Sequence, residues 1–390
     1  MLRRFNLKPF REYFSSSSVG GIVLISCVTV SLLIANLPLG IPFENFLNST
    51  VGWKNEWVDL EFTLLHWIND GLMAVFFLLV GLEIKREILE GELSSPQKAS
   101  LPIIAAFGGA LLPAVIFYLL NRNEPTAAGW GIPMATDIAF ALAALSLLGK
   151  RVPASLKVFL AALAIVDDLI AIGVIALFYS SDIHWNYLLL AGGVLLLLLL
   201  FNRLRLKNIG FYIVPGLFIW YFIHHSGIHA TIAGVLVALT LPLRAGTEAS
   251  PLERLEHFLT KPVNFFIVPL FALANTNIRF EPAMMNGLLE PLGIGIISGL
   301  FAGKTLGIFI STRLAVRLKI GKLPRNAGWK HIIGLGMLAG IGFTMSVFIS
   351  LLSFDDPVLI AEAKLAILIA SVLAALAGCL FMATLQQKTK

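Results

Sequence analysis

The sequence predicts an all-α, polytopic membrane protein. Hydrophobic residues make up 57% of its 390 residues and charged residues only 13%, whereas about 25% of the residues of a soluble domain are charged. Many apolar segments are long enough to cross a hydrocarbon core of about 30 Å, and Lys and Arg are concentrated in the short links between them. The net charge of +6 therefore does not indicate a nucleic-acid-binding domain, which needs clustered basic residues on a soluble surface.

Nine apolar segments each predict one transmembrane span. They cover residues 15–35, 60–82, 99–120, 128–148, 154–179, 185–201, 293–316, 331–353 and 358–383. The first segment follows a basic N-terminus in the manner of a signal peptide. It lacks a clear small-residue cleavage site, so we interpret it as a retained span.

The segment from Ile209 to Leu243 needs a separate argument. It has too many residues for one upright span of about 20 residues and few for two. Basic residues precede and follow it, so both of its ends should face the cytoplasm and the number of crossings should be even. We expect two short helices joined by the turn at His224-His225-Ser226-Gly227. With one further span over 252–275, the total becomes twelve.

The basic residues of the links test this topology. If both termini are cytoplasmic, every second link should be basic. Of the 29 basic residues, 24 fall in links expected to be inside, and three, Lys54, Arg122 and Arg279, fall outside. Only Lys304 and Lys364 remain, both within apolar segments. The pattern predicts a multi-pass membrane protein with both termini in the cytoplasm.

The first outer link, residues 41–59, has an unusual composition. It holds Phe43, Phe46, Trp53 and Trp57 among polar residues. Aromatic residues of this kind form belts at the membrane surface. A belt is the reading that composition favours, and the alternatives are a small extramembrane hairpin, an amphipathic turn or a contact with a partner.

Asp167 and Asp168 lie side by side in the otherwise apolar segment 161–173. Ionisable groups at bilayer depth are costly and normally mark an ion path or a proton relay. Neighbours on a helix diverge by about 100°, so the two carboxylates cannot enter one cavity in the same way. We expect one to face water and the other to face a buried partner.

Lys304 is the only basic residue available at mid-depth to partner a carboxylate. Gly299, Gly303 and Gly307 surround it with a stripe of small residues that lets another helix approach closely. The stripe either brings Lys304 within reach of a neighbouring span or serves packing alone.

Two spans are interrupted by glycines and polar residues. The first contains Pro133-Met-Ala-Thr136-Asp137, and the second contains Gly340-Ile-Gly342-Phe-Thr344-Met-Ser346. Backbone groups released by a break must be satisfied by protein or water, and Asp137 could offset the positive end of a half-helix. The interruptions occupy the middle of spans three to five and of spans ten to twelve. Matched interruptions of this kind indicate an inverted repeat with a binding site at the midplane, although glycine-rich packing is the alternative.

Two charged groups lie at the predicted cytoplasmic ends of the second and ninth spans. The first is Gly81-Leu-Glu83-Ile-Lys85-Arg86-Glu87, and the second is Arg254-Leu-Glu256-His257. Such charges usually form solvated i,i+3 and i,i+4 pairs. Together they could instead form a cluster that responds to pH.

With these segments in order, the chain resembles the NhaA-type sodium/proton antiporters over nearly its whole length. Further matching segments are Ala164-Ile-Val-Asp167-Asp168, Gly227-Ile-His229-Ala-Thr231 and Gly303-Lys304. The resemblance implies two broken helices that cross at mid-membrane. It also implies a division into four ranges: 1–98 as part of an interface domain, 99–180 as the first core repeat, 181–285 as the rest of the interface domain, and 286–390 as the second core repeat. A homodimer held partly by the 41–59 link is implied as well.

The resemblance also assigns roles to residues. Asp167 and Asp168 would carry the cation, Na⁺ or Li⁺, and the protons, with Asp168 the main cation ligand and Asp167 the partner of Lys304. Thr136 and Asp137 would shape the site, with the breaks formed around Pro133, Gly340, Gly342, Thr344 and Ser346. The set implied in the pH response is Glu83, Arg86, Glu87, His229, Glu256 and His257. Phe258 departs from the family pattern, which has a small β-branched residue there, and this puts the pH set point in question.

The expected function is therefore electrogenic, pH-dependent export of Na⁺ and Li⁺ in exchange for H⁺. Such a transporter is not an enzyme and needs no cofactor, and its partners are lipid, the transported ions and a second copy of the chain. We also consider a non-transporting Na⁺ or pH sensor, an ion channel and an intramembrane aspartyl protease. The last needs two aspartates on separate spans sharing a proton, and Lys304 and matched broken helices have no role in that chemistry.

Overall fold

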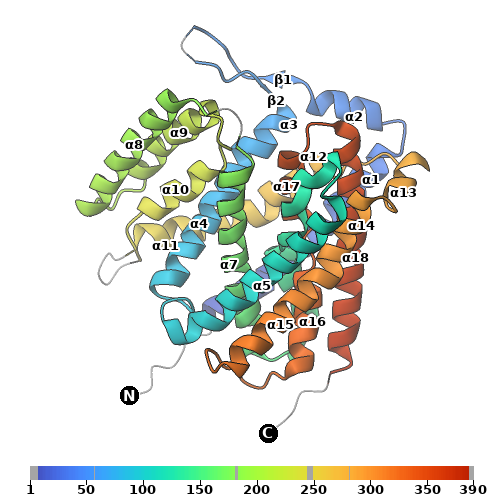
Figure 1. The fold of residues 1–390 in the computed structure, drawn as a ribbon. Coiled ribbons are helices and arrows are strands. Elements are labelled where there is room, and N and C mark those ends of the chain that lie inside the picture. The colour runs from blue at the N-terminus through green and yellow to red at the C-terminus, as the bar shows by residue number, and fades with distance from the viewer. Residues whose placement is uncertain (1–7, 57, 181–182, 244–248, 281, 386–390) are drawn as a thin grey trace.

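The computed structural model describes residues 8–56, 58–180, 183–243, 249–280 and 282–385. Trp57 and the basic residues Arg3, Arg4, Arg244, Lys388 and Lys390 of the predicted topology lie outside these ranges. Helices dominate the described chain, as the composition predicts (Figure 1). The only strands in the described ranges are β1 (Thr50–Val51) and β2 (Phe62–Thr63), which pair antiparallel with Thr50 opposite Thr63.

The first half of the chain is a series of helices with one small hairpin. It consists of α1 (Lys8–Ala35), α2 (Gly40–Leu47), the β1–β2 hairpin, α3 (Leu64–His66), η1 (Trp67–Leu72), α4 (Met73–Leu89), α5 (Pro96–Asn121), η2 (Pro125–Met134), α6 (Ile138–Leu147), η3 (Gly149–Arg151) and α7 (Ala154–Phe178). The hairpin projects from the upper end in Figure 1, and Lys54 Nζ lies 2.6 Å from Asp59 Oδ2 beyond its strands. The 41–59 link therefore contains most of α2 and the first strand of a hairpin that closes at Phe62–Thr63. A hairpin was one of the alternatives that its composition left open.

The second half begins with the helices α8 (Trp185–Arg203), α9 (Gly210–His225) and α10 (Ile232–Thr240), drawn on the left of Figure 1. The prediction of two short helices between Ile209 and Leu243 is confirmed by α9 and α10. The chain continues through α11 (Pro251–Pro262), η4 (Val263–Ile267), α12 (Val268–Asn275), α13 (Pro282–Gly287), α14 (Pro291–Ser298), η5 (Gly299–Gly303), α15 (Lys304–Arg317), α16 (Trp329–Ala339), α17 (Phe343–Ser353) and α18 (Pro357–Ala383).

Six helices of the described chain are long and apolar enough to cross a membrane, and the number rises to nine if each of three bent pairs is one span. The bent pairs are residues 19–35 with α2, at 113°, η2 with α6, at 44°, and α16 with α17, at 48°. α4, α9 and α10 are too short to be counted among these helices, with 17, 16 and 9 residues. The structure thus supports a polytopic membrane protein but not a count of twelve spans.

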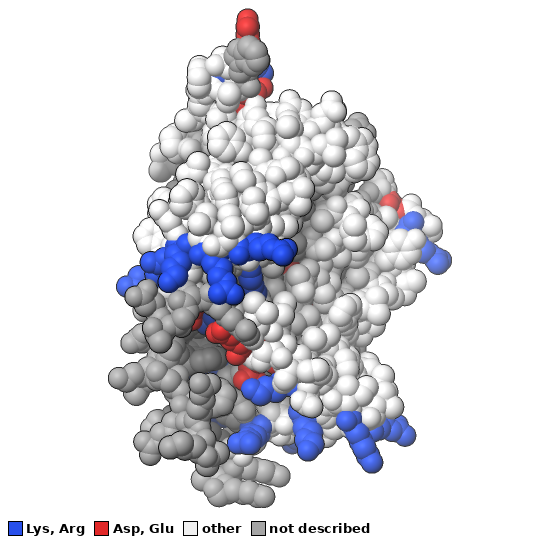
Figure 2. Space-filling model, turned by 90° about the vertical axis from the view of Figure 1, so that its left-hand side faces the viewer, with Lys and Arg blue, Asp and Glu red and all other residues white. Residues whose placement is uncertain are grey.

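The exposed surface has the composition expected of a lipid-facing protein. Leu189, Leu196 and Leu200 on α8 are 73%, 68% and 50% exposed, although the helix has a mean hydropathy of 1.8. So much exposed apolar area would be unfavourable in water. On the face shown in Figure 2, Lys and Arg gather across the middle and at the lower end, and the upper part is uncharged except at its tip.

Glycines allow two pairs of helices to touch through their backbones. A Cβ atom on Gly307 of α15 would lie 2.1 Å from the carbonyl oxygen of Gly108 on α5, and one on Gly303 would lie 3.0 Å from Pro113 Cα. A Cβ atom on Gly234 of α10 would likewise lie 2.1 Å from the carbonyl oxygen of Ala74 on α4. The glycine stripe therefore does bring the start of α15, with Lys304, against a neighbouring helix.

We predict that Gly307→Ala destabilises the protein by about 1–3 kcal/mol, the usual cost of overpacking, because the added methyl meets backbone that cannot move aside alone. Thermal unfolding in detergent measures this. Gly192→Ala on α8 is the matched control, since nothing lies within 4 Å of a Cβ atom there, and it should be neutral or stabilising. Equal melting temperatures for the two variants would contradict the backbone contact.

Candidate functional site

The two broken helices meet at their breaks. The backbone N–H of Asp137 donates to the carbonyl of Ile341 over 2.7 Å, and the Thr136 hydroxyl donates to the carbonyl of Ala339 over 2.9 Å. The Ser346 hydroxyl donates to the carbonyl of Ile132 over 2.8 Å. Each break therefore satisfies backbone groups of the other, as broken helices away from water require.

Asp137 lies between the N-termini of two half-helices. It is the N-cap of α6, where Oδ1 accepts the backbone N–H of Phe140 over 3.0 Å. Its Oδ2 accepts both the backbone N–H of Thr344, over 3.2 Å, and the Thr344 hydroxyl at the start of α17. Since helix N-termini carry partial positive charge, a single carboxylate offsets two of them, where the sequence led us to expect one.

Lys304 supplies the opposite charge at the end of η2. Its ammonium donates to the carbonyl of Met134, the last residue of η2, and to Asp167 Oδ2, 2.6 Å away. The Lys304 side chain is 0% exposed. The pairing of Lys304 with a carboxylate that the sequence predicted is thus present, and the carboxylate is Asp167. The added contact with Met134 places a cation at a negative helix end.

Asp168 differs from its neighbour. Both aspartates are buried in α7, with residue exposures of 1% for Asp167 and 3% for Asp168. Whereas Asp167 is neutralised by Lys304, the Asp168 carboxylate has no hydrogen bond or ion pair with any residue that the structure describes. The adjacent side chains point apart, as the helical geometry predicted. Asp168 is therefore the carboxylate available to an ion.

The chemistry of this centre suits a small hard cation or a proton. Carboxylate, hydroxyl and carbonyl oxygens surround the breaks, and hard cations prefer such ligands. A proton and a cation would compete for the same carboxylate, because protonation removes its charge.

The charged residues at the ends of α4 and α11 form a second group. Arg86 Nε lies 3.3 Å from Glu256 Oε2, and Arg86 Nη2 lies 3.3 Å from Glu87 Oε1. Glu83 is close enough to Glu256 to repel it. These contacts bring together four of the six residues assigned to a pH response, Glu83, Arg86, Glu87 and Glu256, which we call the Arg86 cluster.

The side chains of the remaining two residues of that set take no part in these contacts. His257 is exposed and forms no ion pair within the described ranges. His229 follows α9 and is near Asp70 and His224 instead; burial lowers its pKa, and the Asp70 charge opposes this shift. Phe258, the departure from the family pattern, is 70% exposed, so its ring does not fill the cluster of α4 and α11.

Sequence reasoning missed several residues that hold the breaks in place. The Tyr179 hydroxyl accepts the backbone N–H of Gly131, over 3.1 Å, and donates to the carbonyl of Ala128, over 2.9 Å. Ser371 on α18 accepts the backbone N–H of Phe343 over 3.1 Å. No pattern around these residues distinguishes them from ordinary membrane tyrosines and serines.

We predict that Lys304→Ala lowers the free energy of unfolding by about 3–5 kcal/mol, because it leaves the Asp167 carboxylate and the Met134 carbonyl buried without their cation. Thermal unfolding in detergent is the measurement. Lys330→Ala, at an exposed lysine on α16, should change stability by less than about 0.5 kcal/mol. The double variant Lys304→Gln with Asp167→Asn should recover part of the loss, and no recovery would argue against the pair as its cause.

Comparison with known proteins identifies the family of this chain. The family model described as Na⁺/H⁺ antiporter 1 matches residues 11–382. Na⁺/H⁺ antiporter NhaA 2 of Flavobacterium johnsoniae is 59% identical over 98% of this chain and 94% of its own length. Na⁺/H⁺ antiporter NhaA 1 of Clostridium beijerinckii is 48% identical over 95% of this chain and 94% of its own length.

A solved structure shares the fold. The sodium proton antiporter MjNhaP1 of Methanocaldococcus jannaschii, determined at pH 8, superposes with a TM-score of 0.54 over 97% of this chain and 99% of its own. Its sequence is only 14% identical, so the likeness concerns the fold. The family match and the relatives concern transporters rather than enzymes, and together they show that this chain belongs to the NhaA-type Na⁺/H⁺ antiporter family.

Proposed function

We propose that this protein exchanges Na⁺ for H⁺ across a bacterial inner membrane, with Asp168 as the main cation ligand. The observation that carries the proposal is the pairing state of the two aspartates: Lys304 neutralises Asp167, and Asp168 has no partner within the described chain. Two relatives that are 59% and 48% identical to this chain are named Na⁺/H⁺ antiporters, which supports Na⁺ and H⁺ as the exchanged ions.

In the proposed cycle, cation and proton use the same carboxylates in turn. Na⁺ or Li⁺ binds deprotonated Asp168 from the cytoplasm, the core rocks against the interface domain, and the cation leaves outside. Protons then load Asp168 and either Asp167 or Lys304 and are carried inward. Because more than one group can carry a proton, exchange is electrogenic and the membrane potential drives export.

The proposed architecture has twelve spans, with α4, α9 and α10 as three of them, inverted repeats at 99–180 and 286–390, and both termini in the cytoplasm. The interface domain comprises 1–98 and 181–285 and joins two copies, partly through the β1–β2 hairpin. The Arg86 cluster at the inner ends of α4 and α11 contributes to the pH response, and the protein needs no cofactor.

We predict that inverted vesicles from a host without its own Na⁺/H⁺ antiporters, acidified by respiration, lose acidity when Na⁺ or Li⁺ is added. Asp168→Asn should abolish the response, because an amide cannot exchange a proton for a cation. Asp355→Asn, at an exposed residue between α17 and α18, is the matched control and should retain it. A channel or a sensor would produce no Na⁺-driven proton release against a gradient, and full exchange by Asp168→Asn would refute the site.

Competition at one site also predicts how pH acts. The apparent KM for Na⁺ should rise by up to about tenfold for each unit of falling pH if one proton displaces the cation, while the maximal rate changes less. Exchange rates measured over a matrix of Na⁺ concentrations and pH values test this. A constant KM with a falling maximal rate would instead place pH control in a separate switch such as the Arg86 cluster.

A further inference from the structure

His66, Asp70 and His224 converge at the end of the molecule that carries the hairpin. His66 Nε2 lies 3.4 Å from Asp70 Oδ2, and His224 Nδ1 lies 3.3 Å from the same oxygen. The three atoms all lie within 4.8 Å of one another. It is the one group of three or more such side chains with metal-like spacing among the described residues, and the proposed transport cycle does not use it.

The distances match a tetrahedral zinc site. With Zn–N and Zn–O bonds of about 2.0–2.2 Å, two ligand atoms of a tetrahedron are about 3.3–3.5 Å apart. Two of the three separations already have this value, and the third must close by about an ångström or so from its upper limit of 4.8 Å. The His66 side chain is 38% exposed, so its ring has room to turn.

His66 provides a second, independent observation. Its Nε2 atom is buried and forms no hydrogen bond within the described chain, although the Asp70 carboxylate lies 3.4 Å away. A buried polar atom without a partner is unfavourable and calls for an explanation such as a missing ion or water. This atom faces the Asp70 carboxylate, where a cation would be stabilised.

The backbone holds the first two ligands in position. The His66 backbone N–H donates to the Thr63 hydroxyl over 3.1 Å, which starts α3 directly after the hairpin. Asp70 lies in η1, a π-helical turn. Turns of this kind are rare and occur frequently at functional sites.

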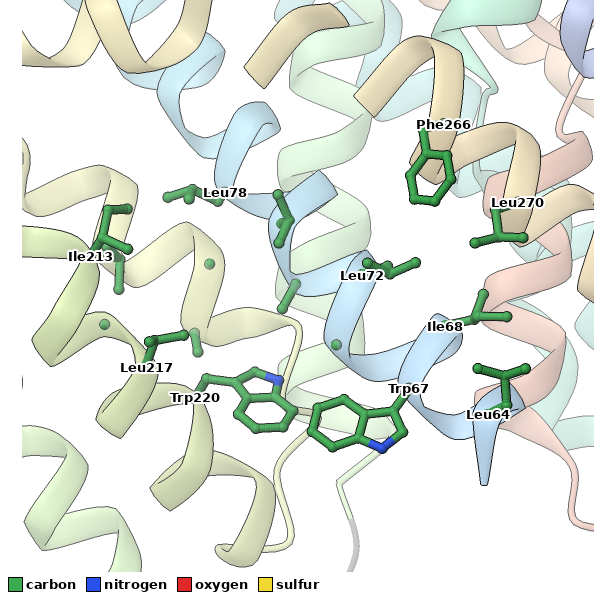
Figure 3. Close-up of a pocket in the computed structure, with 17 residues that line it drawn as sticks. Leu64, Trp67, Ile68, Leu72, Leu78, Ile213, Leu217, Trp220, Phe266 and Leu270 are labelled. Carbon is green, nitrogen blue, oxygen red and sulfur yellow. The ribbon is translucent and has the colours of Figure 1, made fainter. Parts of the chain in front are cut away.

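Aromatic rings hold His224 beside the other two. The Phe62 ring stacks on His66 at 4.7 Å and meets His224 edge-on at 4.8 Å. Trp67 and Trp220, the labelled indoles that face each other in Figure 3, stack at 5.8 Å and join η1 to α9. The three ligands therefore come from α3, η1 and α9, which these rings already hold together, and this lowers the entropy cost of binding an ion.

We propose that His66, Asp70 and His224 form a binding site for Zn²⁺, with water as the fourth ligand. Two imidazoles and one carboxylate suit a borderline-soft transition metal, whereas Na⁺ prefers oxygen ligands alone, so the site is chemically distinct from the one at Asp168. Bound Zn²⁺ would cross-link α9 to the α3–η1 segment at the hairpin end.

The test uses the purified full-length protein in detergent, with any polyhistidine tag removed and metals stripped by chelator. Titration with Co²⁺, followed by visible absorption, should give the intense bands of a tetrahedral site at one equivalent per chain. One equivalent of Zn²⁺ should abolish them. Zn²⁺ should also raise the melting temperature, since a ligand that binds only the folded state stabilises it.

His224→Gln, His66→Gln and Asp70→Asn should each weaken binding by more than about tenfold, because even outer-shell partners of a metal ligand contribute 10- to 100-fold. His225→Gln is the matched control. The His225 ring borders the His224 ring edge-on, but its Nδ1 is 2.9 Å from the Tyr221 carbonyl and its ring also packs against Tyr187 and Tyr221, so this variant should bind Zn²⁺ as the native chain does. The metal-free melting temperature of each variant shows whether it is folded. Undiminished binding in folded ligand variants, or no tetrahedral Co²⁺ spectrum in the native protein, would overturn the proposal.

Discussion

Backbone groups that a broken helix leaves unpaired away from water must find partners within the protein. The structure at the centre of this molecule depends on the residues that provide those partners. Four half-helix ends meet at the breaks of η2–α6 and α16–α17. Asp137 accepts hydrogen bonds from the N-termini of α6 and α17. Lys304 donates to the C-terminus of η2, and the Thr136 hydroxyl donates to the end of α16. Opposite charges and neutral donors thus stand where the partial charges of the helices require them.

This arrangement gives Lys304 two tasks at once. Its ammonium both neutralises Asp167 and binds the end of η2, so the proton on Lys304 matters to the fold as well as to any ion. Asp168, on the same helix turn, forms no hydrogen bond or ion pair with the described residues. Under the proposed function, two adjacent residues would therefore divide the work, with Asp167 stabilising the structure and Asp168 binding the ion.

Much of this centre could be predicted because few residues can play each part. Lys304 was the one cation at mid-depth, and glycines at 299, 303 and 307 left it a close neighbour, so its pairing followed from elimination and spacing. The two breaks were visible because glycine and proline interrupt otherwise apolar spans. The double role of Asp137 was not predictable, since it depends on α17 arriving from more than 200 residues away.

Other features left no signal in the sequence. The contact of Lys304 with Met134 involves a backbone carbonyl, which any residue provides. The resemblance links His229 to pH sensitivity without placing it, and the structure puts it near Asp70 and His224. A turn between short helices has no periodicity that fixes its direction, so the sequence could not give this position. The convergence of His66 and Asp70 with His224 likewise arises from tertiary packing across some 150 residues.

The backbone contacts at Gly307 and Gly234 carry a mechanical consequence. Helices usually slide past each other on a layer of side chains that can change rotamers, which permits shear. This layer is missing at the contact between α5 and α15 and at the contact between α4 and α10. Each of these two pairs of helices should therefore move as a rigid body. α7, the helix that carries Asp168, packs against both α5 and α4, so relative displacement of the two pairs must be accommodated on either side of that helix.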